Sequence, residues 1–145
     1  MSDHRMSDDE VEAFLRSAPP HTAKVATVRA DGRPHVAPVW FELDEDGSLV
    51  FTTGERSVKG RGLRRDPRVS LSVDDERPPF TFVVIEGRAT LSTDLQALLL
   101  WATRIGGRYM GEDRAEEYGR RNAVPGELLV RVRPERTVAA RDIAD

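Results

Sequence analysis

The chain has 145 residues, a formal net charge of −3 and no cysteine. This length is typical of one domain that buries about two thirds of its unfolded surface, and we expect a single domain over residues 1–145. The lack of cysteine excludes disulfides, thiolate nucleophiles and cysteine-based zinc sites. No signal-peptide or membrane-spanning run is present, and the net acidity disfavours general nucleic-acid binding. We therefore expect a cytoplasmic protein that binds neither nucleic acid nor membrane.

The first residues are expected to form a tail and a short helix. Residues 1–7 are interpreted as a disordered tail. Ser7 precedes three acidic residues and then apolar residues at helical spacing, which predicts a helix over residues 8–17. The proline pair at 19–20 ends this helix, which we expect to cover one end of a barrel.

Three strands and a helix are predicted next. Two β-rich segments, residues 22–29 and 35–43, flank Asp31-Gly32, which is typical of a hairpin turn. A third strand over residues 48–53 is expected to pair with 35–43 and complete a meander. A short helix over residues 57–65 follows, despite its two glycines.

The second half of the chain predicts four more strands and two helices. Strict alternation over residues 68–74 indicates a strand with one buried face, paired with residues 80–91, where Gly87 marks a bulge. A helix capped by Thr93-Asp94 is expected to stop at Gly106-Gly107, and a second helix to span residues 112–121. The last two strands, 127–133 and 137–142, are separated by Pro134. The pattern as a whole predicts an α+β fold with six or seven antiparallel strands curled into a small barrel and helices at its periphery.

A basic window over residues 55–68 stands out against the acidic average. It holds six cations and two acids, a local charge of +4. A strand ending in Thr52 and Thr53 is followed by Ser57 as a helix cap and by Lys59, so hydroxyls, a cation and free amides gather at one place. Such an arrangement suits a phosphate ester. The alternative for the arginines of the window is a solvated helix face.

The segment from Pro38 to Trp40 is the candidate apolar wall for a flat heterocycle near that phosphate. The alternative is that Trp40 only packs in the core.

Other chemistries find no support. The histidines His4, His21 and His35 lack metal-ligand spacing, and no serine lies in a nucleophile elbow. The glycines at 60 and 62 belong to no dinucleotide fingerprint, and Lys59 is followed by glycine rather than the serine or threonine of a phosphate-binding loop. We therefore expect no metal site and no catalytic side chain, so that a bound cofactor carries the chemistry.

Four segments in the same order resemble a known family. They are the hairpin Asp31–Val36 and the segments Val50–Gly60, Leu63–Leu71 and Val84–Ala89. They are similar to the split β-barrel flavin and deazaflavin reductases, whose founding member is pyridoxamine 5'-phosphate oxidase. The resemblance implies an FMN-binding split barrel that forms a homodimer, with the cofactor in a groove between subunits and a small-molecule substrate.

The resemblance also implies positions for the cofactor. Its phosphate would lie near the third strand and the following helix, and its ring against the strand that ends at Trp40. The late helices, with Trp101 and Tyr109, are weaker candidates for completing the site of the other subunit. The implied cofactor-binding residues are Pro38, Val39, Trp40, Thr52, Thr53, Ser57, Val58, Lys59 and Arg61.

Departures from the family guide the choice of cofactor. Vitamin oxidases carry an arginine and a lysine where Ala37 and the apolar run up to Phe41 stand here, which disfavours that activity. The segment 59–68 instead resembles the subgroup that uses the deazaflavin coenzyme F-420, whose polyglutamate tail would suit the surplus arginines, although Gly62 replaces an asparagine common there. We expect an F-420-dependent oxidoreductase that transfers hydride between the reduced coenzyme and a small electrophilic substrate. The alternatives are an FMN-binding reductase or oxidase and a non-catalytic coenzyme-binding protein.

Overall fold

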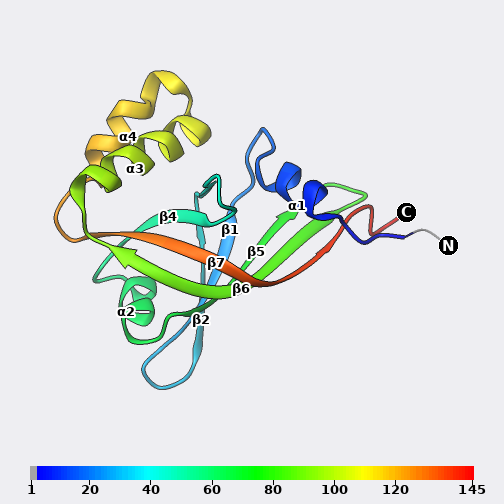
Figure 1. Cartoon of the computed structure of the whole chain (residues 1–145), viewed down its shortest axis with the longest axis horizontal. Helices are drawn as coiled ribbons and strands as arrows, with labels where there is room; N and C mark the ends of the chain where they lie inside the picture. The colour runs from blue at the N-terminus through cyan, green and yellow to red at the C-terminus, as the bar shows by residue number, and fades with distance from the viewer. Residues whose placement is uncertain (1–2) are drawn as a thin grey trace.

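The computed structural model describes residues 3–145 and shows seven strands in one strongly curled antiparallel sheet, with helices at its periphery (Figure 1). The strand order is β2-β1-β5-β6-β7-β4-β3. The predicted α+β split barrel is therefore confirmed. The elements are α1 (Asp8–Leu15), β1 (Ala23–Val28), β2 (Pro34–Val39), β3 (Glu42–Leu43), β4 (Leu49–Gly54), α2 (Val58–Arg65), β5 (Arg68–Asp75), β6 (Thr81–Ser92), α3 (Leu95–Met110), the 3-10 turn η1 (Glu112–Arg114), α4 (Ala115–Asn122) and β7 (Glu127–Ala140).

Helix α1 begins at the predicted cap. The Ser7 hydroxyl accepts the Glu10 amide at 3.2 Å, and the Glu10 carboxylate accepts the Ser7 amide at 3.1 Å, which satisfies two backbone donors reciprocally. The helix ends at Leu15, two residues before the predicted end. One apolar face of α1 packs on the main core through Leu15, which is 3% exposed.

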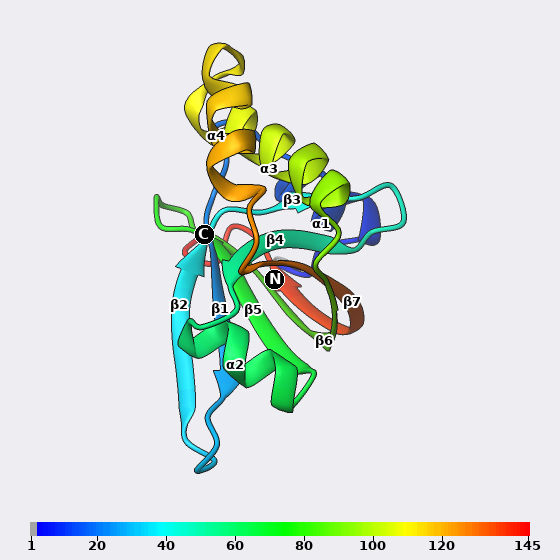
Figure 2. The same cartoon turned by 90° about the vertical axis from the view of Figure 1, so that its left-hand side faces the viewer.

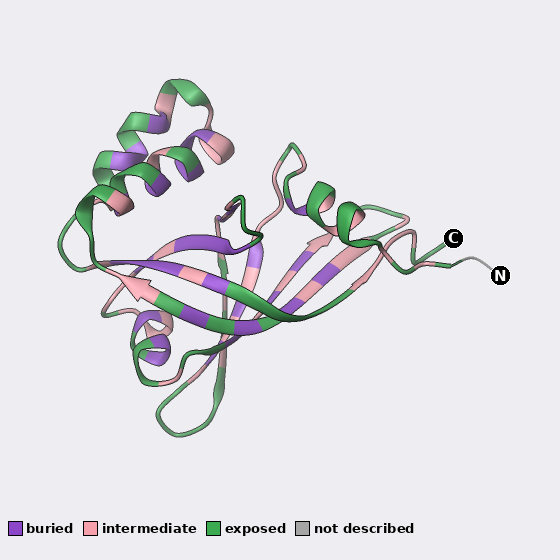
Figure 3. Ribbon diagram, viewed as in Figure 1, coloured by how far each residue is buried: buried purple, intermediate pink, exposed green. Residues whose placement is uncertain are grey.

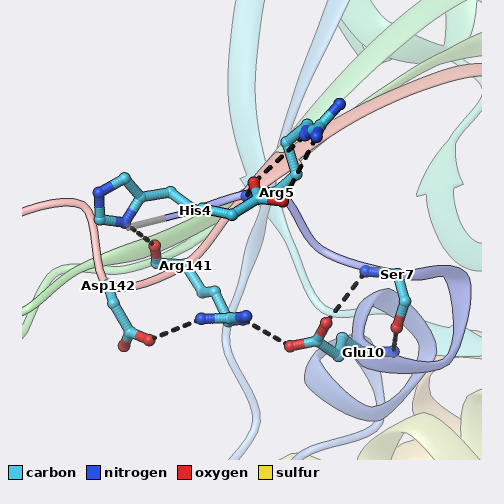
Figure 4. Close-up of polar contacts among 7 residues, drawn as sticks. His4, Arg5, Ser7, Glu10, Arg141 and Asp142 are labelled. Atoms are coloured by element: carbon cyan, nitrogen blue, oxygen red, sulfur yellow. Dashed lines mark hydrogen bonds and ion pairs between the residues drawn. The ribbon is translucent and has the colours of Figure 1, made fainter. Parts of the chain in front are cut away.

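The N-terminal segment lies along the end of β7. Residues 1–2 of the predicted tail lie outside the described residues, whereas Arg5 forms a β-bridge with Ala140 and the His4 carbonyl accepts the Arg141 amide at 2.8 Å. The Arg141 guanidinium also donates to Glu10 at 2.6 Å and to Asp142 at 3.1 Å (Figure 4). These contacts, invisible to local sequence patterns, connect residues 3–7 to the barrel.

The predicted strand over residues 35–43 is wrong in one respect, because it breaks at Trp40 and Phe41. The Phe41 amide donates to the Tyr109 hydroxyl at 3.2 Å, and its carbonyl accepts from Arg108 at 2.6 Å, so side chains of α3 replace the strand partners. As a result β2 pairs only with β1, and β3 makes the short pairing with β4. The predicted pairing of residues 48–53 with 35–43 is confirmed only at Glu42–Leu43, and the long partner of β4 is β7.

Helix α3 runs through the two glycines that were predicted to end it. A Cβ atom on Gly106 would lie 2.4 Å from the Tyr118 Cβ, so the glycine allows close packing of α4 on α3. The helix ends instead at Gly111, whose φ of +99° favours glycine. The second late helix is confirmed as η1 and α4.

The last strand is continuous, so the predicted split at Pro134 is wrong. Gly87 of β6 lies opposite Pro134, and Glu86 lies opposite Arg136, which leaves Glu135 as the extra residue of a β-bulge. The predicted irregularity at Gly87 is confirmed. A proline lacks an amide to donate, and a bulge is where a strand tolerates it.

The main core fills the curled sheet, with buried residues alternating along the strands (Figure 3). A second, smaller cluster joins α3 to the sheet through Leu98, Trp101, Val50 and Leu129. On the predicted apolar face of α3, Leu95 and Leu99 stay 46% exposed, whereas Leu98 in the same turn is fully buried. Among residues 3–145, no helix has the length and apolar character needed to cross a membrane.

Candidate functional site

A cleft of about 420 Å³ lies where β2 and β4 end, between α2 and the α3–α4 pair. Figure 2 shows these elements on either side of β4. The cleft also receives the first residue of β7. Five of the nine predicted cofactor-binding residues line it: Pro38, Val39, Trp40, Thr52 and Lys59.

The apolar wall of the cleft is held rigidly by aromatic packing. The Trp40 ring stacks on Tyr109, with centroids 5.2 Å apart and an interplanar angle of 5°, and meets Tyr118 edge-on at 5.5 Å. The Tyr109 hydroxyl donates to the His21 carbonyl at 2.6 Å, and burial raises the pKa of Tyr109. Trp40 is therefore both a packed residue and a lining residue of the cleft, and its contact with a heterocycle stays a prediction.

The aromatic residues of the late helices serve their own chain. Trp101 is 5% exposed and lies in the smaller core cluster, with the Arg104 guanidinium 4.5 Å from its ring centroid. Tyr109 is occupied by Trp40 and by two backbone groups. These contacts engage both rings within their own chain, and their contribution to a second subunit's site stays a prediction.

The helix cap predicted at Ser57 is confirmed, and the Ser57 hydroxyl is engaged in hydrogen bonds within the chain. Its oxygen accepts the Gly60 amide at 3.0 Å, its proton goes to the Gly54 carbonyl at 2.7 Å, and Thr53 Oγ1 lies 3.0 Å away. Thr53 itself is 6% exposed. These two hydroxyls stabilise the start of α2. Lys59, in the first turn of α2, extends into the cleft and forms no ion pair with any described residue.

The remaining two predicted residues lie elsewhere. Val58 and Arg61 line a separate hollow of about 310 Å³, together with residues of the β1–β2 turn. Helix α2 thus presents Lys59 to the cleft and Arg61 to another side. Of the six cations in the basic window, Lys59 is the one that lines the cleft.

Two other arginines of the window pair with its two acids. Arg64 contacts Glu55 at 3.1 Å, and Arg68 contacts Asp66 at 2.6 Å. Hydrogen bonds from the Arg68 side chain lower the pKa of Asp66 to about 2. For Arg64 and Arg68 these exposed pairs agree with the predicted alternative of a solvated face.

Glu127 is a cleft residue that the sequence did not reveal. Burial raises its pKa, while the Leu128 amide and the Lys59 ammonium lower it. Its Oε2 atom is shielded from solvent and has no hydrogen-bond partner. Only the pairing of Gly54 with Glu127 across β4 and β7 brings it near Lys59, and no local motif signals that pairing. Among residues 3–145, no cluster of potential metal ligands is present.

Comparison with known proteins agrees with the geometry. The pyridoxamine 5'-phosphate oxidase family model matches residues 7–139. A Mycobacterium tuberculosis biliverdin reductase that depends on reduced coenzyme F-420 is 32% identical over 143 residues, which cover 97% of this chain and 93% of that protein.

Two solved structures show the same fold at similar length. The crystal structure of a conserved hypothetical protein from Mycobacterium tuberculosis has a TM-score of 0.84 and 27% identity, and covers 100% of this chain and 92% of that one. An F-420 reductase has a TM-score of 0.67 and 28% identity, with coverage of 87% and 94%. With a family match over most of its length, the chain belongs to the pyridoxamine 5'-phosphate oxidase family.

Proposed function

We propose that the protein is an F-420-dependent oxidoreductase that transfers hydride between the reduced coenzyme and a small electrophilic substrate. The observation that carries this proposal is the cleft itself, which joins a packed apolar wall at Pro38–Trp40 to Lys59, a cation with no ion-pair partner within residues 3–145. The relative that uses reduced F-420 matches nearly the whole chain and supports the same cofactor class.

The residues of the cleft fit a deazaflavin. A planar ring needs an apolar wall, and its phosphate needs a nearby cation. Pro38, Val39 and Trp40 would hold the ring, and Lys59 with Thr52 would hold the phosphate end. The volume of about 420 Å³ accommodates part of such a molecule, and a second subunit would cover the rest.

The chain's own residues contribute position rather than proton transfer. The bound coenzyme supplies the hydride from its ring carbon. The stacked Trp40 and Tyr109 fix the wall against which the ring lies, which orients the reacting face. Residues of α3 that also line the cleft, among them Ala102 and Ile105, would help to exclude water from the ring.

A homodimer is part of the same proposal, with the cofactor at the subunit interface, and so is a cytoplasmic location. The second candidate function is an FMN-dependent reductase or oxidase, favoured by membership of the pyridoxamine 5'-phosphate oxidase family. The third is a protein that binds the coenzyme without turning it over.

The test is a fluorescence titration of the Trp101→Phe variant, in which Trp40 is the remaining tryptophan and lies in the cleft. F-420 and FMN are added side by side at moderate salt. Stronger quenching by F-420, followed by oxidation of the reduced coenzyme with an enone, a quinone or a tetrapyrrole, is expected. Preference for FMN would support the second candidate, and F-420 binding with no turnover would support the third. Binding of neither would contradict the proposal.

A further inference from the structure

The polar end of the cleft carries one positive and one negative side chain. Among the described residues that line it, Lys59 and Glu127 are the charged ones. They come from different elements, the first turn of α2 and the first residue of β7. Glu127 pairs across the sheet with Gly54, three residues before the cap of α2, which explains the proximity.

Lys59 and Glu127 influence each other without touching. No ion pair within 4.0 Å joins them, yet the ammonium group lowers the pKa of the Glu127 carboxyl against the effect of burial. The shielded Oε2 atom of Glu127 has no hydrogen-bond partner among the described residues. The carboxylate is thus poorly compensated, and it responds strongly to any further charge placed near Lys59.

The two candidate cofactors differ in the charge that they would place there. FMN ends in a phosphate monoester, which carries close to two negative charges above its second pKa of about 6. Coenzyme F-420 carries a phosphodiester at the corresponding position, with a single negative charge. A second charge there would be attracted more strongly by Lys59, but it would also repel the Glu127 carboxylate or force it to take up a proton. This cost exceeds the gain where the carboxylate is shielded from solvent and has an oxygen without a hydrogen-bond partner among the described residues.

We propose that Glu127 is a specificity-determining residue that makes the Lys59 end of the cleft select a phosphodiester over a phosphate monoester. This inference rests on the proposed function, because it places the cofactor phosphate at Lys59. It assigns a role to a side chain that carries none in the proposed hydride transfer.

The experiment compares FMN with its methyl phosphodiester, which share ring and ribityl chain and differ in phosphate charge. At pH 8 the wild-type protein is expected to bind the methyl ester more tightly than FMN. In Glu127→Gln the affinity for FMN should rise about tenfold and that for the ester about threefold or less, since the dianion feels the carboxylate twice as strongly. Glu45→Gln, in an exposed turn, is the matched control and should change neither.

A comparison that needs no variant keeps the inference testable if Glu127→Gln folds poorly. At pH 5.5 the monoester loses its second charge and the carboxyl group moves toward protonation. Both changes act in the same direction, so the wild-type preference for the ester should shrink toward equality. Equal binding of the two ligands by the wild-type protein at pH 8, or equal gains for both in Glu127→Gln, would overturn the inference.

The outcomes separate this inference from the proposed function. If F-420 neither binds nor turns over while the charge preference disappears in Glu127→Gln, the proposed function fails and the role of Glu127 stands. If F-420 is turned over while the preference is unchanged in the variant, the role of Glu127 fails and the proposed function stands.

Discussion

Lys59 is the residue on which the candidate site depends most directly. It is the positive side chain of the cleft lining and has no ion-pair partner among the described residues. We predict that Lys59→Ala weakens coenzyme binding by about 1–3 kcal/mol, through loss of a charge-assisted contact, without lowering the melting temperature. Isothermal titration calorimetry measures the affinity. Arg64→Ala, which removes an exposed cation of the same helix, is the control, and unchanged affinity in Lys59→Ala would place the phosphate elsewhere.

Asp66 provides a pH prediction at the same scale. Its pKa falls from 3.8 to about 2 because the Arg68 side chain and amide donate hydrogen bonds to the carboxylate. A carboxyl group with a lowered folded-state pKa stabilises the fold above its unfolded pKa and loses this contribution as the pH falls toward 2. A carboxyl-carbon NMR titration should find the Asp66 midpoint near 2. In Arg68→Gln the midpoint should return toward 3.8, and a midpoint that stays low would contradict this cause.

Local patterns predicted individual residues well where the interaction spans a few positions. The caps at Ser7 and Ser57 both form, because each hydroxyl reaches an amide three residues ahead. Glu127 illustrates the opposite case, because only the pairing of β4 with β7 brings it to the cleft. In the sequence, Glu127 is simply a charged residue before an apolar strand, and this local pattern does not indicate that Lys59 lies near it.

At the scale of elements, Arg108 joins three segments that are distant in sequence. Its guanidinium donates to the Phe41 carbonyl and to the Leu15 carbonyl, both at 2.6 Å, and lies 4.9 Å from the Phe41 ring centroid. Burial lowers its pKa, so the group depends for compensation on these two acceptors and on the more distant Ser17 carbonyl at 3.4 Å. The contact connects α3 to the end of α1 and to the break between β2 and β3.

We predict that Arg108→Met lowers the free energy of unfolding by about 2 kcal/mol, because two carbonyls lose a charged donor. Urea denaturation measures the change. Arg120→Met on α4, which removes an exposed pair with Glu116, is the control and should cost less than about 1 kcal/mol. Equal losses in the two variants would contradict the role assigned to Arg108.

Elements were mispredicted where glycine and proline were interpreted as breakers. Gly106 lies inside α3, because the close packing of α4 leaves no room for a side chain there. Pro134 lies inside β7, because the bulge tolerates a residue without an amide proton. Conversely, the strand through Trp40 looks continuous in sequence but breaks because α3 takes its backbone hydrogen bonds. Each error comes from a contact between residues more than ten positions apart.

For the whole molecule, the order of strands could be predicted only in part. The hairpins β1–β2 and β5–β6 follow from adjacent segments, whereas β1 with β5 and β4 with β7 are long-range pairings. The family resemblance supplied the split barrel that the local patterns left as a general barrel. Composition and periodicity alone predicted the class. The predicted six or seven strands include the observed seven only because the break at Trp40 adds one strand and the continuous β7 removes one.

The homodimer is the prediction that belongs to the whole molecule. Large apolar side chains stay exposed on the sheet and on α3, including Val36 at 65% and Leu100 at 55%. Light scattering is expected to give twice the chain mass of 16.2 kDa. Coenzyme affinity should fall when the protein is diluted into its dissociation range, and a monomer that binds with undiminished affinity would contradict an interfacial site.

The bulge at Glu135 changes which positions of β7 face the core. Before it, Val130 and Val132 face the core, so even-numbered positions point inward; beyond it, Ala139 packs on the core while Val138 is 47% exposed, so odd-numbered positions do. Removing a residue from a regular strand turns every later side chain to the other face. Removing Glu135 would instead leave both halves correctly oriented, although the ladder would still lack the hydrogen bond that Pro134 cannot donate. Within β7, Glu135 is therefore a position where one residue can be deleted while the later side chains keep their faces of the sheet.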